Sequence, residues 1–321
     1  MGADISLVLL TYNQADTAAD AARSCLAQEG PPIEIILSDD ASADGTYGVL
    51  ERVALAYSGP HRVRLNRNER NLGIAKHFNR LVSIAAGQLI VEAAGDDISL
   101  PGRVQQVAQA WEQTGRRVDL IAHALIDMSS DGVDRGTIRV DDLARWRSAD
   151  DWVARRPYVI GAGHAWTRRL FDRFGPLGDG IAYEDQVLTL RALLSGGALT
   201  IHEPLARYRR GGTSGKARMA TREAVLERMQ VQNNRHLAEL TQMRRDAQLA
   251  GAWTIVETLQ RELARQSYLQ RLLAARDDRG GLLRTMFSAG PEVPVGWRWR
   301  KFTSVSLAGM TALKHRLRDR R

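Results

Sequence analysis

Two stretches near the start of the sequence decide the fold, ISLVLLTYN at residues 5–13 and IEIILSDDAS at residues 33–42. In each, a short and almost uninterrupted apolar run leads directly into polar residues. This pattern is typical of a strand that is buried on both faces of a sheet and ends in a loop. The intervening residues 16–28 have the spacing of a helix, so the segment predicts a βαβ unit with parallel strands.

The same alternation of strands and helices continues through residues 1–125. We expect further strands at residues 63–65, 88–92 and 118–123, and further helices at residues 45–57, 74–86 and 101–114. In parallel sheets of this kind, ligands bind at the carboxyl ends of the strands. The polar residues that directly follow the predicted strands are therefore the first candidates for a functional site.

The composition is that of an ordinary globular protein. Of the 321 residues, 44% are hydrophobic and 26% are charged, which excludes collagenous, coiled-coil and disordered classes. The single cysteine, Cys25, excludes an intrachain disulfide framework and a multi-cysteine zinc site; we expect a small core residue. No apolar run approaches the roughly 18 residues that span a bilayer, and the run at residues 5–10 is too short for a signal peptide. We therefore expect a cytoplasmic protein.

The positive charge is concentrated at the C-terminus. The formal net charge is +8, and residues 291–321 hold eight Lys/Arg against two acidic residues, which is +6. The remaining +2 on residues 1–290 gives no reason to expect a nucleic-acid partner. In the tail, WRWRK at residues 297–301 alternates aromatic and basic side chains, as interfacial membrane anchors do. A solvated helix end or an oligomer contact would give the same pattern, and the sequence leaves these alternatives open.

Acidic residues follow two of the predicted strands, in SDDASADGT at residues 38–46 and in AGDD at residues 94–97. Adjacent carboxylates repel one another unless a cation or a set of hydrogen-bond donors lies beside them. Their hard oxygen ligands suit Mg²⁺ or Mn²⁺. Taken alone, each Asp-Asp pair is more often a solvated turn or a helix cap.

The combination of motifs is more specific than any one of them. The chain contains, in this order, TYN at residues 11–13, DDASADGT at 39–46, NLG at 71–73, GDD at 95–97 and YEDQ at 183–186. Their order and spacing resemble the inverting nucleotide-sugar glycosyltransferases of family 2, over roughly residues 4–215. The resemblance implies the GT-A fold, an α/β fold whose Rossmann-like, mostly parallel sheet is flanked by helices.

The resemblance also implies an activity. It predicts a metal-dependent enzyme that moves a single sugar from a nucleotide-diphosphate sugar to an acceptor hydroxyl with inversion, in the assembly of surface polysaccharide or glycan. The Gln-x-x-Arg-Trp signature of processive synthases is absent, which favours single transfers. A catalytically silent sugar-nucleotide-binding or scaffolding protein on the same fold is the main alternative. A nucleotidyltransferase is disfavoured because no Gly-rich basic loop follows the first strand.

Carried over position by position, the resemblance assigns a role to each motif residue. The nucleotide pocket would be lined by Thr11, Tyr12, Asn13, Asp39, Asp40, Asn71, Arg209 and Arg210. Within this set, Asp40 would accept the imide N–H of a uracil-type base, which favours a UDP- or dTDP-linked donor. Arg209 or Arg210 would meet the diphosphate, since a guanidinium fork matches phosphate oxygens.

The remaining motif residues would carry the chemistry. Asp96 and Asp97 would hold Mg²⁺ or Mn²⁺, which with protein cations stabilises the leaving diphosphate. Asp185 would be the catalytic base that makes the acceptor hydroxyl nucleophilic, with Glu184 beside it near the acceptor. The acceptor would be a glycan or a lipid-linked molecule.

Two departures from the family pattern are the reason for considering a catalytically silent protein on the same fold. Ala94 stands where many relatives carry the first Asp of an Asp-x-Asp motif, and no His follows Tyr208-Arg209-Arg210. The first departure weakens the metal assignment without removing it, because some members keep only the later Asp pair. The intact Glu184-Asp185 pair favours the enzyme.

The chain extends beyond the region of resemblance. We expect the GT-A domain at residues 1–219, a helical appendage at residues 220–290 and a basic Trp/Arg-rich tail at residues 291–321. The appendage is a candidate dimerisation or packing element, so a homo-oligomer stays open. The anchor hypothesis for the tail would place the enzyme on the inner face of the membrane.

Overall fold

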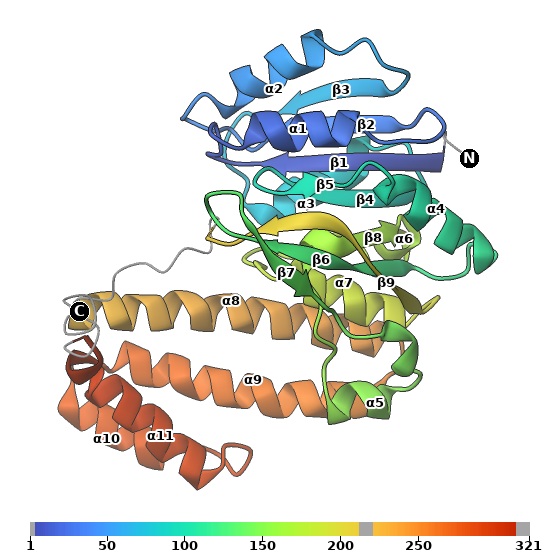
Figure 1. Ribbon diagram of the computed structural model, residues 1–321. Helices are drawn as coiled ribbons and strands as arrows, with labels where there is room; N and C mark the ends of the chain where they lie inside the picture. The colour runs from blue at the N-terminus through green and yellow to red at the C-terminus, as the bar shows by residue number, and fades with distance from the viewer. Residues whose placement is uncertain (1–3, 212–220, 313–321) are drawn as a thin grey trace.

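The computed structural model describes residues 4–211 and 221–312. Within them, one nine-stranded sheet forms the centre of the N-terminal region (Figure 1). The strands follow the order β3 (Arg62–Arg67), β2 (Glu34–Asp39), β1 (Ile5–Thr11), β4 (Leu89–Ala94), β8 (His164–Thr167), β6 (Leu120–Met128), β9 (Ala198–Arg209) and β5 (Ile98–Ser99), and β7 (Asp134–Ile138) pairs with β6.

Strands β3, β2, β1 and β4 run parallel, as the sequence predicts for its βαβ units. The register pairs Thr11 with Asp39, and Leu10 with both Ser38 and Ala94. These strands therefore end at one level of the sheet, and the polar loops that follow them emerge together. Beyond β4 the sheet is mixed, because β8 runs antiparallel to β4 and β6 whereas β9 runs parallel to β6.

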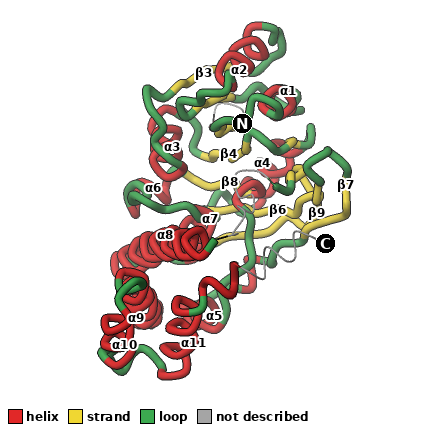
Figure 2. Tube along the Cα trace, turned by 90° about the vertical axis from the view of Figure 1, so that its left-hand side faces the viewer, coloured by secondary structure: helices red, strands yellow, loops and turns green. Residues whose placement is uncertain are grey.

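Helices connect the strands and cover both faces of the sheet (Figure 2). They are α1 (Ala18–Leu26), α2 (Thr46–Leu55), α3 (Ile74–Ile84), α4 (Arg103–Gln113), α5 (Ala149–Ala154), α6 (Arg169–Phe174) and α7 (Glu184–Leu193), with short 3₁₀ turns η2 (Leu143–Arg145) and η3 (Gly161–Gly163). In β1, Leu7 and Leu9 pack with α1, α2 and α4, whereas Val8 and Leu10 pack with α3, α6 and α7. Successive strand side chains alternate between faces, so an uninterrupted apolar strand needs a helical layer on each side.

The C-terminal helices form a hairpin and two shorter helices. They are α8 (Arg222–Leu249), α9 (Trp253–Ala274), α10 (Arg279–Phe287) and α11 (Val295–Ser306). Leu240 and Met243 of α8 and Leu259 of α9 belong to the same core as α3 and α7. The other end of the hairpin forms a separate core, in which Tyr268 of α9 packs with Val305 of α11. No helix in the described part of the chain is long and apolar enough to cross a membrane.

A buried ion pair fixes α8 against α7. The Arg191 guanidinium donates from Nε to Asp246 Oδ2 at 2.7 Å, and both side chains are fully buried. Gln242 Nε2 donates to the other Asp246 oxygen at 2.8 Å, and Arg191 Nη1 donates to Gly175 O at 2.8 Å. Buried charges persist only when they are paired and hydrogen-bonded in this way. The contact therefore links the hairpin to the helix that begins with Glu184.

Candidate active site

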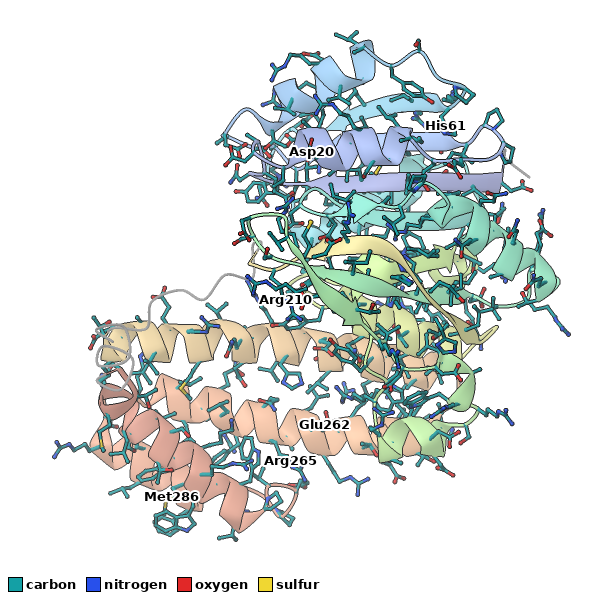
Figure 3. All side chains as sticks on the ribbon, viewed as in Figure 1. Asp20, His61, Arg210, Glu262, Arg265 and Met286 are labelled. Carbon is teal, nitrogen blue, oxygen red and sulfur yellow. The ribbon has the colours of Figure 1, made fainter. Side chains whose placement is uncertain are left out.

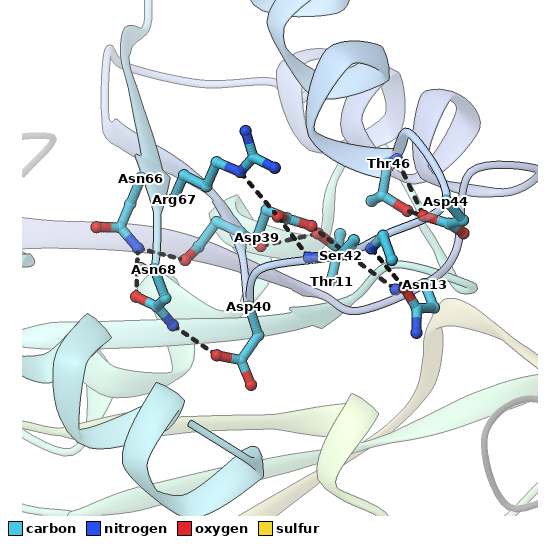
Figure 4. A network of polar contacts seen from close by, with 12 residues as sticks. Thr11, Asn13, Asp39, Asp40, Ser42, Asp44, Thr46, Asn66, Arg67 and Asn68 are labelled. Atoms are coloured by element: carbon cyan, nitrogen blue, oxygen red, sulfur yellow. Dashed lines mark hydrogen bonds and ion pairs between the residues drawn. The ribbon is translucent and has the colours of Figure 1, made fainter. Parts of the chain in front are cut away.

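Hydrogen bonds join the loops after β1 and β2 into one surface at the carboxyl edge of the sheet (Figure 4). The Asp40 N–H donates to Thr11 O at 3.0 Å. The Asn13 N–H donates to Ser42 Oγ at 2.8 Å, and Asn13 Oδ1 accepts the Ala43 N–H at 3.0 Å. The sequence therefore correctly predicts that these polar segments meet.

Two residues in these loops have left-handed backbone conformations. Asn13 has φ 50° and Ala41 has φ 58°. Asn tolerates this region, but for Ala41 it costs on the order of 1–3 kcal/mol, and such strain persists where the surrounding contacts fix it, often in functional loops. Tyr12 follows β1 directly and keeps 38% of its surface exposed. Its ring is therefore accessible to a planar ligand.

Asp39 shapes its own loop. Its carboxylate accepts the Ser42 N–H at 3.0 Å and the Ser42 hydroxyl at 2.5 Å, and Arg67 Nε lies 3.8 Å away. The side chain of Asp39 is completely buried. These contacts support the surrounding loop rather than leave the carboxylate open to a ligand.

Asp40 connects the loop after β2 to the beginning of α3. Its carboxylate accepts Asn68 Nδ2 at 2.7 Å and the N–H groups of Leu72 and Gly73, both at 2.9 Å. Asn71 Oδ1 also accepts the Gly73 N–H, at 2.8 Å. A carboxylate has about four lone-pair sites, so these three bonds leave one acceptor position, on a residue that is 3% exposed.

The loop after β4 places Asp96 and Asp97 beside the loop after β1. The Gly95 N–H donates to Leu10 O at 2.9 Å, and a Cβ at Gly95 would lie 2.6 Å from Thr11 Cγ2, so only glycine fits there. Burial and the neighbouring Asp96 raise the pKa of Asp97 to about 8. Burial also raises the pKa of Asp96. A divalent cation would stabilise the ionised form of both carboxyl groups.

Arg209 and Arg210 at the end of β9 already bind protein groups. The Arg209 N–H donates to Asp97 Oδ1 at 2.8 Å and its Nε donates to Asp96 O at 3.0 Å. Arg210 instead forms a fork with Asp127 on β6, at 2.7 and 3.1 Å. The structure therefore brings Arg209 to the Asp96-Asp97 turn and directs Arg210 toward β6. Residues 212–220 lie outside the described part of the chain.

The Glu184-Asp185 pair begins α7. Glu184 is buried and Asp185 is partly exposed. Burial and the charge of Asp185 raise the pKa of Glu184 to about 8, whereas burial raises the pKa of Asp185 to about 6. Near neutral pH, Glu184 therefore keeps a proton while Asp185 is ionised. Of the two groups, the ionised Asp185 is the one suited to accept a proton from a ligand.

Comparison with known families identifies the chain. The sequence profile of glycosyl transferase family 2 matches residues 6–169, just over half of the chain. The chain belongs to glycosyl transferase family 2. The matched region contains β1, β2 and β4 with their polar loops, whereas the Glu184-Asp185 pair lies beyond it.

Curated relatives of this family 2 chain include proteins named for polysaccharide synthesis. It is 32% identical over 132 residues to the putative glycosyltransferase EpsE of Bacillus subtilis, which covers 41% of this chain and 46% of EpsE. It is 32% identical over 115 residues to the succinoglycan biosynthesis protein ExoO of Rhizobium meliloti, covering 36% of this chain and 32% of ExoO. The chain thus spans less than half the length of these relatives.

Two solved structures share the fold over almost the whole family 2 chain. TarS from S. aureus in complex with UDP-GlcNAc superposes with a TM-score of 0.55 at 13% identity, covering 97% of this chain and 92% of TarS. A mannosyltransferase from Pyrobaculum calidifontis in complex with GDP-Man and Mn²⁺ gives 0.53 at 17% identity, covering 100% and 89%. The predicted GT-A fold is confirmed.

The sequence motifs of this family 2 chain do not indicate Glu92, which lies on β4. Gly161 marks where three carboxyl residues meet, because a Cβ there would lie 3.6 Å from Glu92 Oε1, 3.1 Å from Glu184 Oε1 and 3.5 Å from Asp185 Cβ. Glu92 is buried, and its Oε2 has no hydrogen-bond partner within the described residues. The only signal in the sequence is one charged residue inside the apolar run LIVEAA at residues 89–94.

A buried arginine supports the Glu92 segment. Arg103 Nη2 donates to Glu92 O at 2.6 Å and to Ala162 O at 2.8 Å, and Nη1 donates to Ser99 Oγ at 3.0 Å. Burial raises the pKa of Glu92 well above its ordinary range, Glu184 and Asp185 raise it further, and the charge of Arg103 opposes the shift. Arg103 therefore links β4 to the η3 turn, which lies next to the carboxyl groups of Glu92 and Glu184.

Other parts of the family 2 chain offer weaker candidate sites. A groove of about 640 Å³ lies between α1 and α2, lined mainly by apolar residues with Arg23 and Arg52. It contains none of the predicted carboxylates. Within residues 4–211 and 221–312, no group of three or more His, Cys, Asp or Glu side chains is arranged to hold a metal ion. The strand-end loops therefore remain the candidate site.

Proposed function

We propose that the chain is an inverting, metal-dependent glycosyltransferase that moves one sugar from a nucleotide-diphosphate sugar to an acceptor hydroxyl in surface polysaccharide assembly. One observation carries the proposal: the partly exposed Asp185 lies beside β4, the strand that leads into Asp96-Asp97. A base and a potential cation site are thus supplied by neighbouring elements. The names of ExoO and EpsE and the UDP-GlcNAc complex of TarS support the same reaction class.

Proton transfer in this proposal is the work of Asp185. Its carboxylate takes the proton of the acceptor O–H, the acceptor oxygen bonds to the anomeric carbon, and the bond from that carbon to the diphosphate oxygen breaks. Attack from the face opposite the leaving group inverts the anomeric centre. Glu184, which keeps its proton near neutral pH, can donate a hydrogen bond to the acceptor without competing for the transferred proton.

The metal is part of the proposal because the residues present fit it. Asp96 and Asp97 supply two carboxylates, which matches how Mg²⁺ or Mn²⁺ binds with one or two carboxylates and substrate phosphates. Burial, and after it repulsion from Asp96, raises the pKa of Asp97 to about 8, and a bound cation would favour the ionised form. When bound, the cation would stabilise the charge that develops on the leaving diphosphate. Arg209 holds this turn in place through Asp97 Oδ1 and Asp96 O.

The donor base is proposed to contact Asp40 and Tyr12. The free acceptor position of Asp40 suits an imide N–H, which favours a UDP- or dTDP-linked donor. Asp39, Asn13 and Asn71 would support this pocket through the loop contacts described above. The two structural neighbours were solved with UDP-GlcNAc and with GDP-Man, so nucleotide choice is a matter for measurement. A glycan or lipid-linked acceptor, and a cytoplasmic location, complete the proposal.

A nucleotide panel tests donor binding. Thermal unfolding of the full chain is measured with UDP, dTDP, GDP and their sugar conjugates, each with and without Mn²⁺. We expect one nucleotide to raise Tm in a Mn²⁺-dependent way, because selective ligand binding stabilises the folded state. The absence of a shift with every nucleotide and metal condition would contradict donor binding, and a shift without turnover of any donor would favour the silent alternative.

The variant Asp185→Asn tests the base. We expect donor turnover to fall by about 100-fold or more, since a positioned general base contributes on this scale, while the nucleotide-induced rise in Tm persists. The matched control is Asp179→Asn, because Asp179 is exposed and pairs with the half-exposed Lys76 at 2.9 Å. Full turnover by Asp185→Asn would refute the base assignment.

A further inference from the structure

Helices α10 and α11 present apolar side chains to solvent at one end of the hairpin. They pack next to each other and against α9, and Figure 1 shows them at the end of the hairpin remote from α5. Several large apolar residues here are half or more exposed, namely Leu283, Phe287, Val295, Trp299, Leu307 and Met310. Phe287 is 74% exposed. Exposed apolar residues scattered singly need no explanation, whereas a concentration of them marks an interaction surface.

The exposed residues occupy the outer faces of these helices. In α10, Leu282 and Met286 are buried while Leu283 and Phe287, four residues apart, are exposed; Figure 3 labels Met286. In α11 and the turn after it, Val305 and Ala308 face the core, while the exposed residues include Trp299. Residues three or four apart share a helix face. Each helix therefore keeps two large apolar side chains exposed outside the core, Leu283 and Phe287 in α10 and Val295 and Trp299 in α11.

The two tryptophans of the WRWRK segment have different roles. Trp297 packs against Tyr268 with ring centroids 6.0 Å apart, so it belongs to the outer core. Trp299 is 51% exposed and meets Phe302 edge-on at 6.1 Å. Trp299 therefore extends the outer apolar face, whereas Trp297 fastens α11 to α9.

The charge around this surface is mainly positive, although the exposed Asp277, Asp278 and Glu292 flank the helices and Asp278 pairs with Arg284 at 3.2 Å. Helices α10 and α11 contain five basic residues and no acidic residue. Arg298 is used internally, donating to Val293 O at 2.7 Å and Gly290 O at 2.6 Å, and Lys301 lies over the Trp297 ring at 5.4 Å. Arg300 is exposed beside Trp299. The sequence continues with five further basic residues and one Asp at positions 313–321, outside the described residues.

We propose that the outer faces of α10 and α11 form a docking surface for an anionic lipid bilayer. Apolar side chains that include an aromatic ring, on helices that contain basic residues and no acidic ones, match a negatively charged headgroup layer over acyl chains. The helices would lie on the bilayer without crossing it. This proposal is independent of donor use, since none of its residues belongs to the candidate active site.

Vesicle sedimentation of the full chain tests the proposal. Vesicles of phosphatidylglycerol mixed with phosphatidylcholine are compared with vesicles of phosphatidylcholine alone, at low and high salt. We expect binding to the anionic vesicles that weakens with salt, and at least roughly ten-fold weaker binding to the neutral ones, since several basic residues near the surface each contribute. This comparison needs no variant. No binding to anionic vesicles, or equal binding to both, would overturn the proposal.

A matched pair of double variants locates the surface. Phe287→Ser/Trp299→Ser should lose on the order of ten-fold or more of vesicle affinity, because two apolar anchors are removed. Leu249→Ser/Trp253→Ser removes residues that are 60% and 63% exposed at the opposite end of the hairpin, and should bind like the wild type. Arg300→Ala should weaken binding roughly five-fold. Equal losses in both double variants, or none in the first, would contradict the assignment.

Two further measurements distinguish lipid docking from self-association and from a loss of activity. Light scattering without lipid reports a dimer; a wild-type dimer that Phe287→Ser/Trp299→Ser converts to a monomer, with no vesicle binding, would mean that a second copy covers the surface and would overturn the lipid proposal. Donor turnover without vesicles should be unchanged in both double variants. A chain that binds vesicles but turns over no donor would contradict the proposed function alone.

Discussion

At the residue scale, three carboxyl groups lie together near Gly161: those of Glu92, Glu184 and Asp185. The chemistry of the site depends on which of them carry a proton. Three carboxyl groups cannot all be ionised in a buried space, because each charge opposes the next. Burial acts most strongly on Glu92 and Glu184 and less on Asp185. The protons therefore collect on the inner residues, and the outermost one is left as a carboxylate.

This distribution predicts a pH-dependent stability effect of Glu92→Gln. The folded-state pKa of Glu92 lies well above its ordinary value of 4.5. Between these two values the folded chain holds a proton that the unfolded chain releases, so wild-type stability falls as pH rises, by at most about 1.4 kcal/mol per pH unit. Gln does not titrate. The free energy of unfolding of Glu92→Gln, measured relative to that of the wild type, should therefore increase from pH 5 to pH 8.

Urea unfolding at several pH values measures this difference. The control is Glu51→Gln, because Glu51 is exposed on α2; its difference from the wild type should stay constant over the same range. A constant difference for Glu92→Gln as well would show that Glu92 is not protonated in the folded chain at neutral pH.

The site residues divide into those that the sequence could indicate and those that it could not. Polar residues after apolar strands can be located because parallel strands end at one edge, and the structure brings Thr11, Asp40 and Asp96 together there. Glu92 could not be found in this way, since its neighbours come from η3 and α7, far along the chain. Cys25 is a buried core residue, as expected, and burial raises its thiol pKa to about 12.

At the scale of single elements, the junction between α7 and α8 carries a clear prediction. Asp246→Asn leaves the Arg191 charge without its partner in a fully buried position, which should cost about 3–5 kcal/mol. The comparison is Asp20→Asn, which breaks the exposed pair between Asp20 and Arg23 and should cost less than about 1 kcal/mol. Equilibrium urea unfolding measures both, and similar small losses would contradict the role of the buried pair.

The strands that the sequence does not predict correctly are those defined by backbone pairing with a neighbouring strand rather than by a pattern of apolar residues. The sequence predicts two strands at residues 199–202 and 205–208, but they form one strand, β9, with register shifts against β6 near Pro204. β7 is exposed and its sequence DRGTI has no apolar run, so only its backbone pairing with β6 defines it. A glycine pair such as Gly280-Gly281 predicts an interruption of helical structure, but both residues lie in the first turn of α10.

At the scale of the whole molecule, the hairpin and the sheet share one core. Cutting the chain at residue 219, the expected domain boundary, would remove Leu240, Met243 and Leu259 from the core that contains α3 and α7. Loss of a buried Leu or Met side chain alone costs about 2–5 kcal/mol, and a whole domain is stable by only about 5–15 kcal/mol. We expect residues 1–219 alone to show no cooperative thermal unfolding.

A chain ending at residue 289 is the matched control, because it keeps α8, α9 and α10 and loses α11 with the residues that flank it. It should unfold cooperatively at a lower temperature than the full chain, because Tyr268 loses its packing against Trp297 and Val305 of α11. A sharp transition and nucleotide binding by residues 1–219 would mean that the sheet region folds independently after all. The sequence indicates that residues 220–290 are helical. It does not indicate that parts of α8 and α9 belong to the core of the sheet region, because such packing depends on partners distant in sequence.

The length of α8 has a consequence for which acceptors the chain can use. Val225 belongs to the outer core that holds α11. At Glu239, 14 residues later, burial raises the carboxyl pKa and the nearby charge of Asp185 adds to the shift. At 1.5 Å per residue these positions are about 20 Å apart along the helix. If α10 and α11 dock on a bilayer as proposed, the length of α8 limits how far Asp185, the proposed base, can lie from the headgroups. Acceptors whose growing end extends that far from the bilayer would be glycosylated, and shorter ones would be passed over.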